Sequence, residues 1–146
     1  LKEFWSEFVK FEPFAFALAD TSEGGDKRRA EIREASLACK PIVQQVLARV
    51  IVELQKIPEG SKKVSASGVA EVVAKLNQVD WATENPLWTG VLMQSGKIIR
   101  GTPAANFAQR LICYLLGQEL EPVELKKLKE LFDVTTDGKI FPDRIF

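Results

Sequence analysis

The sequence predicts a mainly α-helical protein of about five helices in an orthogonal bundle, with one small β-hairpin near residues 91–100. Apolar residues recur at spacings of three and four over most of the chain, as they do on the buried face of a helix. Strand-like patterning is confined to two short runs that Ser95-Gly96 separates. A chain of 146 residues suits one domain. We therefore expect a single helical domain over residues 1–146.

The first half of the chain predicts two long helices, each interrupted by a proline. The first covers residues 1–19, and Pro13 predicts a break or kink near Glu12. The second begins at Asp26, which we expect to cap it, and ends at Ile57-Pro58. Pro41 either kinks this second helix or marks the point where two helices meet. A turn-rich segment over residues 21–25 separates the two.

A third helix and the hairpin follow. Ser65 or Ser67 is the expected cap of this helix, whose apolar positions extend to Val79. Residues 91–94 and 97–100 then form the predicted hairpin strands. Because two strands alone are marginally stable, we expect the hairpin to pack on helices.

Two further helices complete the prediction. Thr102 is the expected cap of the fourth helix, which Pro103 begins and Gly117 ends. The last helix starts at Glu121-Pro122, and the turn at Asp137-Gly138 leads into an extended tail.

Composition excludes several classes of chemistry. The chain has 20 basic and 20 acidic residues, no histidine and two cysteines. Absence of histidine excludes Ser-His and Cys-His catalysis. Cys39 and Cys113 stand in apolar patterns without metal-ligand spacing, so we expect two small buried side chains in a reducing cytoplasm, with no metal and no cofactor. No apolar run is long enough for a membrane span and no leader pattern opens the chain, so we expect no membrane association. An enzyme confined to this chain is not expected.

Two basic clusters are candidates for contact with DNA phosphates. The first opens the second predicted helix, where glutamates interleave with the arginines and favour a solvated helix start as the alternative. The second combines the hairpin with the start of the fourth helix, where backbone N–H groups and cations can hold anions. The alternative is that these residues only form the hairpin turn and bind nothing. The candidate residues are Arg28, Arg29, Arg33, Lys97, Arg100 and Arg110.

Trp81 and Trp88 bracket the turn at Asn85-Pro86. Such tryptophans usually pin an irregular segment to a core, and the alternative is that they are exposed and stack on bases. Asn85 and Asn106 are expected to satisfy backbone groups in the turn and at the helix start.

The segment from Val79 to Met93 contains an Asp-Trp pair, an Asn-Pro pair and a second Trp, and a hairpin with Gly-Lys and an Asn-bearing helix follow it. This order resembles the C-terminal part of DGQHR-domain proteins, and among them the DndB-like proteins of bacterial DNA phosphorothioation (sulfur-modification) systems. The opening Leu1-Lys2-Glu3-Phe4-Trp5 and the helix with Arg29 and Arg33 are also similar to that family. The Asp-Gly-Gln-His-Arg motif itself is absent, and from Glu121 onward no family feature is present. The residues that carry the resemblance are Trp81, Asn85, Pro86, Trp88, Gly90 and Asn106.

The resemblance implies the C-terminal part of a longer chain, an expectation that the start without methionine also favours. It implies a cytoplasmic, DNA-associated regulatory domain of the transcriptional-repressor type, without catalysis of its own. The implied partners are double-stranded DNA, other subunits of the modification system or a second copy of the chain. One alternative is a protein-interaction or dimerisation module that uses the last helix and the tail with Phe141, Ile145 and Phe146. A further alternative is an accessory domain of a ParB-like nuclease.

Overall fold

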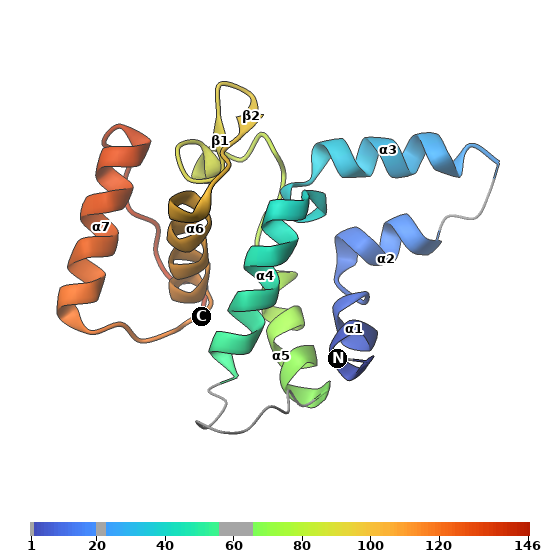
Figure 1. Ribbon diagram of the computed structural model, residues 1–146, viewed down its shortest axis with the longest axis horizontal. Helices are drawn as coiled ribbons and strands as arrows, with labels where there is room; N and C mark the ends of the chain where they lie inside the picture. Colours follow the sequence, from blue (N-terminus) through green and yellow to red (C-terminus); the bar gives the residue numbers. More distant parts are fainter. Residues whose placement is uncertain (1, 20–22, 56–65) are drawn as a thin grey trace. The chain divides into compact units, whose positions relative to one another are not determined.

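The computed structural model describes residues 2–19, 23–55 and 66–146, and the chain divides into two compact units, residues 1–83 and 84–146 (Figure 1). The described residues form seven α-helices, two short 3-10 helices and one two-stranded sheet. The prediction of a mainly helical protein with a small hairpin is confirmed. The predicted number of about five helices is too low, because each predicted long helix in the first half is two helices. The expectation of a single domain stays a prediction.

The first predicted helix breaks where Pro13 indicates. Helix α1 (Lys2–Phe8) is followed by helix α2 (Glu12–Ala19), so that Pro13 lies in the first turn of α2, where its missing N–H costs nothing. The amide oxygen of Asn77 accepts a hydrogen bond of 3.1 Å from the backbone N–H of Glu12. A side chain distant in sequence therefore satisfies one of the free N–H groups at this helix start.

Two helices also meet at Pro41. Helix α3 (Gly25–Ala35) is followed by the 3-10 helix η1 (Leu37–Cys39) and helix α4 (Pro41–Leu54). The predicted cap at Asp26 is wrong: Gly24, with a φ of 86°, precedes the helix, and Asp26 lies in its first turn. The predicted helix end at residues 57 and 58 lies outside the described residues.

Helix α5 (Ala66–Leu76) packs against α1 and contacts α4 (Figure 1). Ser67 lies inside this helix and is not its cap, and the other expected cap, Ser65, is outside the described residues. The segment after α5 then passes along the α3–η1 junction. There the backbone N–H of Leu37 donates to the carbonyl of Trp81 over 2.8 Å. Buried apolar side chains of η1, α4 and α5 form the core of this unit, among them Leu37, Leu47, Ile51, Val69 and Leu76.

The second unit contains the 3-10 helix η2 (Pro86–Trp88) and strands β1 (Met93–Gln94) and β2 (Lys97–Ile98). The strands are antiparallel, and Met93 pairs with Ile98. Ser95 and Gly96 have φ angles of 51° and 73°, as the tight turn of a two-residue hairpin requires. The predicted hairpin is confirmed, with shorter strands than the sequence indicates.

Helix α6 (Thr102–Leu115) and helix α7 (Pro122–Thr136) pack against each other within this unit. The predicted cap at Thr102 is wrong, because Gly101 occupies the N-cap position and Thr102 is the first helical residue. The predicted ends of both helices are confirmed. Gly117 follows α6 with a φ of 97°, and the left-handed pair Asp137-Gly138 follows α7.

The tail after α7 packs on the helices of its own unit. The Phe141 ring lies 5.1 Å from the Tyr114 ring and 5.3 Å from the Phe132 ring, measured between centroids. The backbone N–H of Ile145 donates to the carbonyl of Leu115 over 2.9 Å. Phe141 is therefore half-buried against the helices of its own unit.

Candidate functional site

The two predicted basic clusters lie in different units, so each is considered by itself. Arg28, Arg29 and Arg33 all project from α3. Arg29 and Arg33 are one turn apart, and the Nε of Arg33 donates to the carbonyl of Arg29 over 3.2 Å. Arg28 lies about 100° around the helix from Arg29. The three arginines therefore do not form one face.

Acidic side chains offset most of the charge on α3. Arg29 forms an ion pair with Asp26, and Glu31 and Glu34 lie on the same helix. Four basic residues against three acidic ones leave a net charge of +1 over residues 25–35. This mixture is typical of a solvated helix and provides little field to attract a polyanion.

The hairpin cluster has a different electrostatic character. Lys97 in β2 and Arg100 just after it are exposed, and Gly101, with a φ of 111°, turns the chain from the hairpin into α6. The first turn of α6 therefore follows directly after both cations. Pro103 has no N–H, so the N–H groups of Thr102 and Ala104 form the positive end of this 14-residue helix. We call Lys97, Arg100 and the first turn of α6 the hairpin surface.

No acidic residue occurs between residues 85 and 118, whereas this stretch contains three basic ones. Its net charge is therefore +3 in a chain whose total is zero. No single motif indicates this positive stretch, whereas the sum of charge along the sequence does. Two of these three charges, those of Lys97 and Arg100, lie at the hairpin surface, so a local positive field exists there despite the neutral total.

Arg110 does not belong to the hairpin surface. It lies more than two turns into α6, and its guanidinium is 3.8 Å from the carboxylate of Glu124 on α7. Both side chains are about half exposed, at 45% and 50%. Arg110 thus links α6 to α7, and Glu124 offsets its charge.

The two bracketing tryptophans are core residues. Trp81 is 4% exposed and Trp88 is fully buried, each within its own unit. The indole N–H of Trp81 donates to the carbonyl of Leu76 over 2.9 Å. The expectation that they pin irregular segments is confirmed. The alternative of exposed rings stacking on bases is wrong, because neither ring face is accessible.

The asparagines differ in their roles. The amide oxygen of Asn85 accepts from the backbone N–H of Leu87 over 3.0 Å and caps η2, with Pro86 at its first position. The expectation for Asn85 is confirmed. Asn106 is exposed and lies one turn inside α6, beyond the residues whose N–H groups lack helical partners. It therefore does not cap the start of α6.

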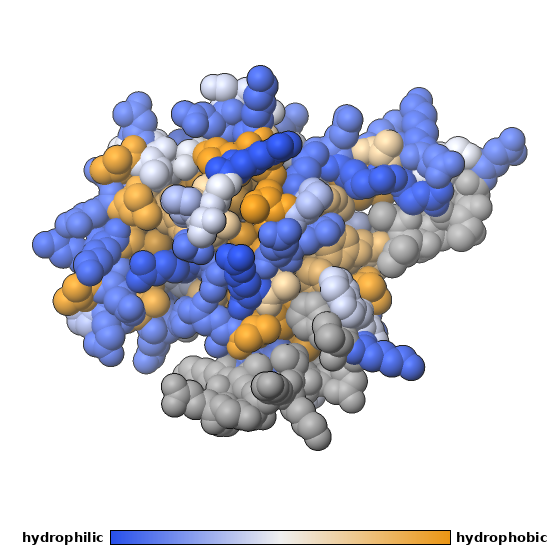
Figure 2. Space-filling view, in the orientation of Figure 1, coloured by the Kyte–Doolittle hydropathy of each residue, from blue (hydrophilic) through white to orange (hydrophobic). Residues whose placement is uncertain are grey.

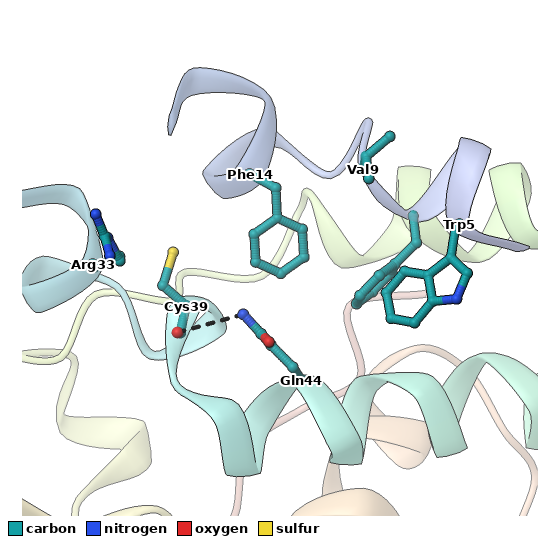
Figure 3. A pocket seen from close by; sticks show the side chains of 7 residues that line it. Trp5, Val9, Phe14, Arg33, Cys39 and Gln44 are labelled. Carbon is teal, nitrogen blue, oxygen red and sulfur yellow. Dashed lines mark hydrogen bonds between the residues drawn. The ribbon is translucent and has the colours of Figure 1, made fainter. Parts of the chain in front are cut away.

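The first unit contains an open, mainly apolar pocket of about 300 Å³ beside α1, α2 and α4 (Figure 3). Gln44 on its floor donates to the carbonyl of Cys39 over 3.4 Å. Burial raises the pKa of the Cys39 thiol above its ordinary value, and the charges of Lys40 and Arg33 offset part of this rise. The lining residues are Trp5, Phe8, Val9, Phe14, Arg33, Cys39 and Gln44.

The expectation of buried cysteines is confirmed for Cys113, whereas Cys39 is only half-buried. In the described part of the chain, no group of three or more cysteine or carboxylate side chains could hold a metal ion. None of the described helices has the length and apolar character needed to cross a membrane.

Comparison with known proteins places the chain in a family. The family model for DndB, described as DNA-sulfur modification-associated, matches residues 1–119. No curated protein matches the chain, and no solved structure does. The matched region covers four-fifths of the sequence, from α1 through α6, and contains all six residues on which the resemblance rests. The relation to DGQHR-domain proteins stays a prediction. The chain belongs to the DndB family of DNA-sulfur-modification-associated proteins.

Proposed function

We propose that this chain is a DNA-associated regulatory domain, of the transcriptional-repressor type, in a bacterial DNA sulfur-modification system. The observation that supports this proposal is the DndB family match over residues 1–119. The proposed ligand is double-stranded DNA, which the domain meets in the cytoplasm. Other subunits of the modification system are the proposed protein partners.

The hairpin surface is the proposed site of DNA contact. Two exposed cations precede a helix N-terminus there, and no carboxylate interrupts residues 85–118. Each phosphate that such a surface neutralises releases condensed counterions, and this release drives binding. Backbone N–H groups at a helix start can contact a phosphate oxygen without reading sequence. The α3 arginines are a weaker candidate, because acidic neighbours offset their charge.

We propose no catalysis by this chain. Histidine is absent from the sequence. A nucleophilic thiol needs a lowered pKa, whereas burial raises the pKa of Cys39. The alternative of an accessory domain of a nuclease has no specific observation in its favour. Supercoiled plasmid incubated with the chain and Mg²⁺ should stay uncut, and nicked or linear product would contradict a non-catalytic role.

Fluorescence anisotropy with labelled duplex DNA tests the proposed contact. The duplex should contain the region upstream of the modification genes, with an unrelated duplex of equal length as competitor. The double variant Lys97→Ala with Arg100→Ala should weaken binding at least about tenfold, because it removes two phosphate contacts. Tighter binding of the upstream duplex would support a regulatory role, and equal affinity for both duplexes would contradict it.

The matched control is the double variant Lys126→Ala with Lys129→Ala. It removes the same charge from the same unit, but both residues lie on α7, outside the hairpin surface. This control should bind like the unaltered chain. A variant with Arg29→Ala and Arg33→Ala tests the α3 cluster in the same assay. If that variant loses affinity and the hairpin variant does not, the hairpin surface is the wrong site.

A further inference from the structure

Exposed apolar side chains gather on α7 and the tail, beyond the part of the chain that matches the DndB family. Val123 is 64% exposed, Leu131 44% and Val134 78%, and Ile140 just after the helix is 95% exposed. In Figure 2, apolar residues interrupt the hydrophilic surface over this helix. Within residues 84–146, every described large apolar side chain with this degree of exposure follows residue 119.

Helical geometry aligns part of this set in one stripe. Residues 123, 127, 130 and 134 follow one another at spacings of four, three and four, so that they lie along one face of α7. The stripe therefore reads Val123, Lys127, Glu130 and Val134, and all four side chains are exposed. The opposite face contains the buried Leu128 and Phe132. Leu131 borders the stripe on one side.

After Glu124, which pairs with Arg110 of α6, the charges on α7 change from basic to acidic along the helix. Basic residues occupy positions 126, 127 and 129, acidic residues follow at 130 and 133, and Asp137 comes directly after the helix. From residue 126 onward this order opposes the helix dipole, which favours acidic residues at the N-terminal end and basic ones at the C-terminal end. The pair Lys126 and Glu130, at 3.8 Å, also has the less favourable of the two orientations along a helix. The helix gains no stability of its own from this order, but a partner with the reverse order complements it.

A second copy of the same helix, lying antiparallel, has that reverse order. We propose that α7 is a dimerisation surface on which two chains pair antiparallel about a two-fold axis near residues 128 and 129. In this register Val123 meets Val134 of the second copy, and Lys127 meets Glu130. The two-fold axis repeats both contacts, so that two apolar contacts flank two ion pairs. A parallel pair would instead place the basic halves against each other.

The Leu131 side chains of both copies then lie on the same side of the interface, near the axis, where they add apolar area. The helix has 15 residues and is about 22 Å long. One helix of this length buries less than the roughly 800 Å² per partner of a standard interface. A small interface leaves little binding free energy after the cost of association, so the dimer is reversible, with a dissociation constant roughly between micromolar and millimolar. It requires no DNA and does not depend on the proposed regulatory function.

Sedimentation equilibrium of the complete 146-residue chain, without DNA, tests the proposal. The mean mass should rise toward twice 16.3 kDa as the concentration approaches about 1 mM. The variant Val134→Glu should stay monomeric. Its matched control is Val52→Glu on α4, where an exposed valine lies outside the proposed surface. This control should dimerise like the unaltered chain.

Charge exchange separates specific pairing from general disruption. Lys127→Glu alone and Glu130→Lys alone each place like charges opposite each other at both symmetric contacts, and each should raise the dissociation constant at least about tenfold. The variant with both exchanges restores opposite charges across the interface and should dimerise again. A chain that is monomeric at every concentration would overturn the proposal. Failure of the double exchange to restore the dimer would overturn the antiparallel register.

Discussion

Gly90 occupies a position where no other residue fits. Its φ is +90°, and a Cβ atom built on it would overlap the carbonyl oxygen of Thr135 near the end of α7. Its backbone N–H donates to the carbonyl of Met93 over 2.7 Å, which fixes the loop that enters β1. Nearby, the Lys139 ammonium donates to the carbonyl of Pro86 over 2.7 Å. The end of α7 and the η2 segment are therefore in close contact, and a side chain at residue 90 would separate them.

Replacing Gly90 by alanine should lower the free energy of unfolding by about 3 kcal/mol or more. The left-handed conformation alone costs an alanine about 1–2 kcal/mol, and the overlap with backbone adds to it. Gly96→Ala is the control: it has a φ of +73° but no atom within 4 Å of the added Cβ. It should lose only the conformational part. Urea denaturation followed by tryptophan fluorescence measures both values, and equal losses would refute the close packing at Gly90.

The thiol of Cys39 should react slowly near neutral pH. Because burial raises its pKa, the folded protein disfavours the thiolate that attacks alkylating reagents. The unfolded chain ionises this thiol at a lower pH than the folded chain does. The stability that the neutral thiol contributes is therefore complete below the ordinary thiol pKa and is lost as pH rises through the folded value.

Mass spectrometry of iodoacetamide alkylation at pH 8 tests this expectation. Cys39 should react more slowly than glutathione under the same conditions, and the rate should climb at higher pH than it does for glutathione. Urea should remove the difference. Alkylation of native Cys39 at the rate of glutathione would contradict the effect of burial.

At the scale of single elements, the hairpin turn is not at its optimum for stability. Ser95 has a φ of 51°, in the left-handed region that asparagine adopts more readily than serine. Asn-Gly is also the preferred pair for a two-residue hairpin turn. We expect Ser95→Asn to raise the free energy of unfolding by about 0.5 kcal/mol, and Ser95→Val to lower it by about 1 kcal/mol. Thermal unfolding of the two variants beside the unaltered chain should give melting temperatures in this order, and the reverse order would show that the turn is of another type.

Elements whose limits depend on proline or on helix-ending glycine could be predicted from the sequence. Pro13 and Pro41 fix φ and exclude a helical interior, so the breaks near them are local properties. The predicted helix caps at Asp26 and Thr102 are wrong for the same reason. In each case a glycine with positive φ, Gly24 or Gly101, precedes the helix and takes the N-cap position. Nothing local distinguishes such a glycine from a loop residue.

The candidate site was predictable in part. Lys97 and Arg100 were identified because they flank a hairpin, and both are exposed. Arg110 has the same charge in the sequence, but α7 provides Glu124 as its partner. That pairing depends on how two helices separated by the 116–121 segment pack, and no local pattern reveals it. The same limit applies to Trp81 and Trp88, whose burial depends on residues distant in sequence.

At the scale of the whole molecule, the net charge is zero, but basic and acidic residues are unevenly distributed along the chain. Residues 84–146 contain eight basic and eight acidic residues, and residues 1–83 contain twelve of each. Within the second unit, residues 85–118 nonetheless have a net charge of +3, and the acidic residues that balance it lie at either end. Because salt screens charges beyond about 8–10 Å, a polyanion near the hairpin senses the local charge and not the total. Neutral composition is therefore compatible with the proposed binding of DNA.

The salt dependence of DNA binding is the most direct test of the proposed hairpin contact. The logarithm of the binding constant should fall linearly with the logarithm of salt concentration for the unaltered chain. For the variant with Lys97→Ala and Arg100→Ala, the slope should be shallower by about 1.8, which corresponds to two lost phosphate contacts. The control with Lys126→Ala and Lys129→Ala should keep the original slope. Equal slopes for the unaltered chain and the hairpin variant would contradict the account.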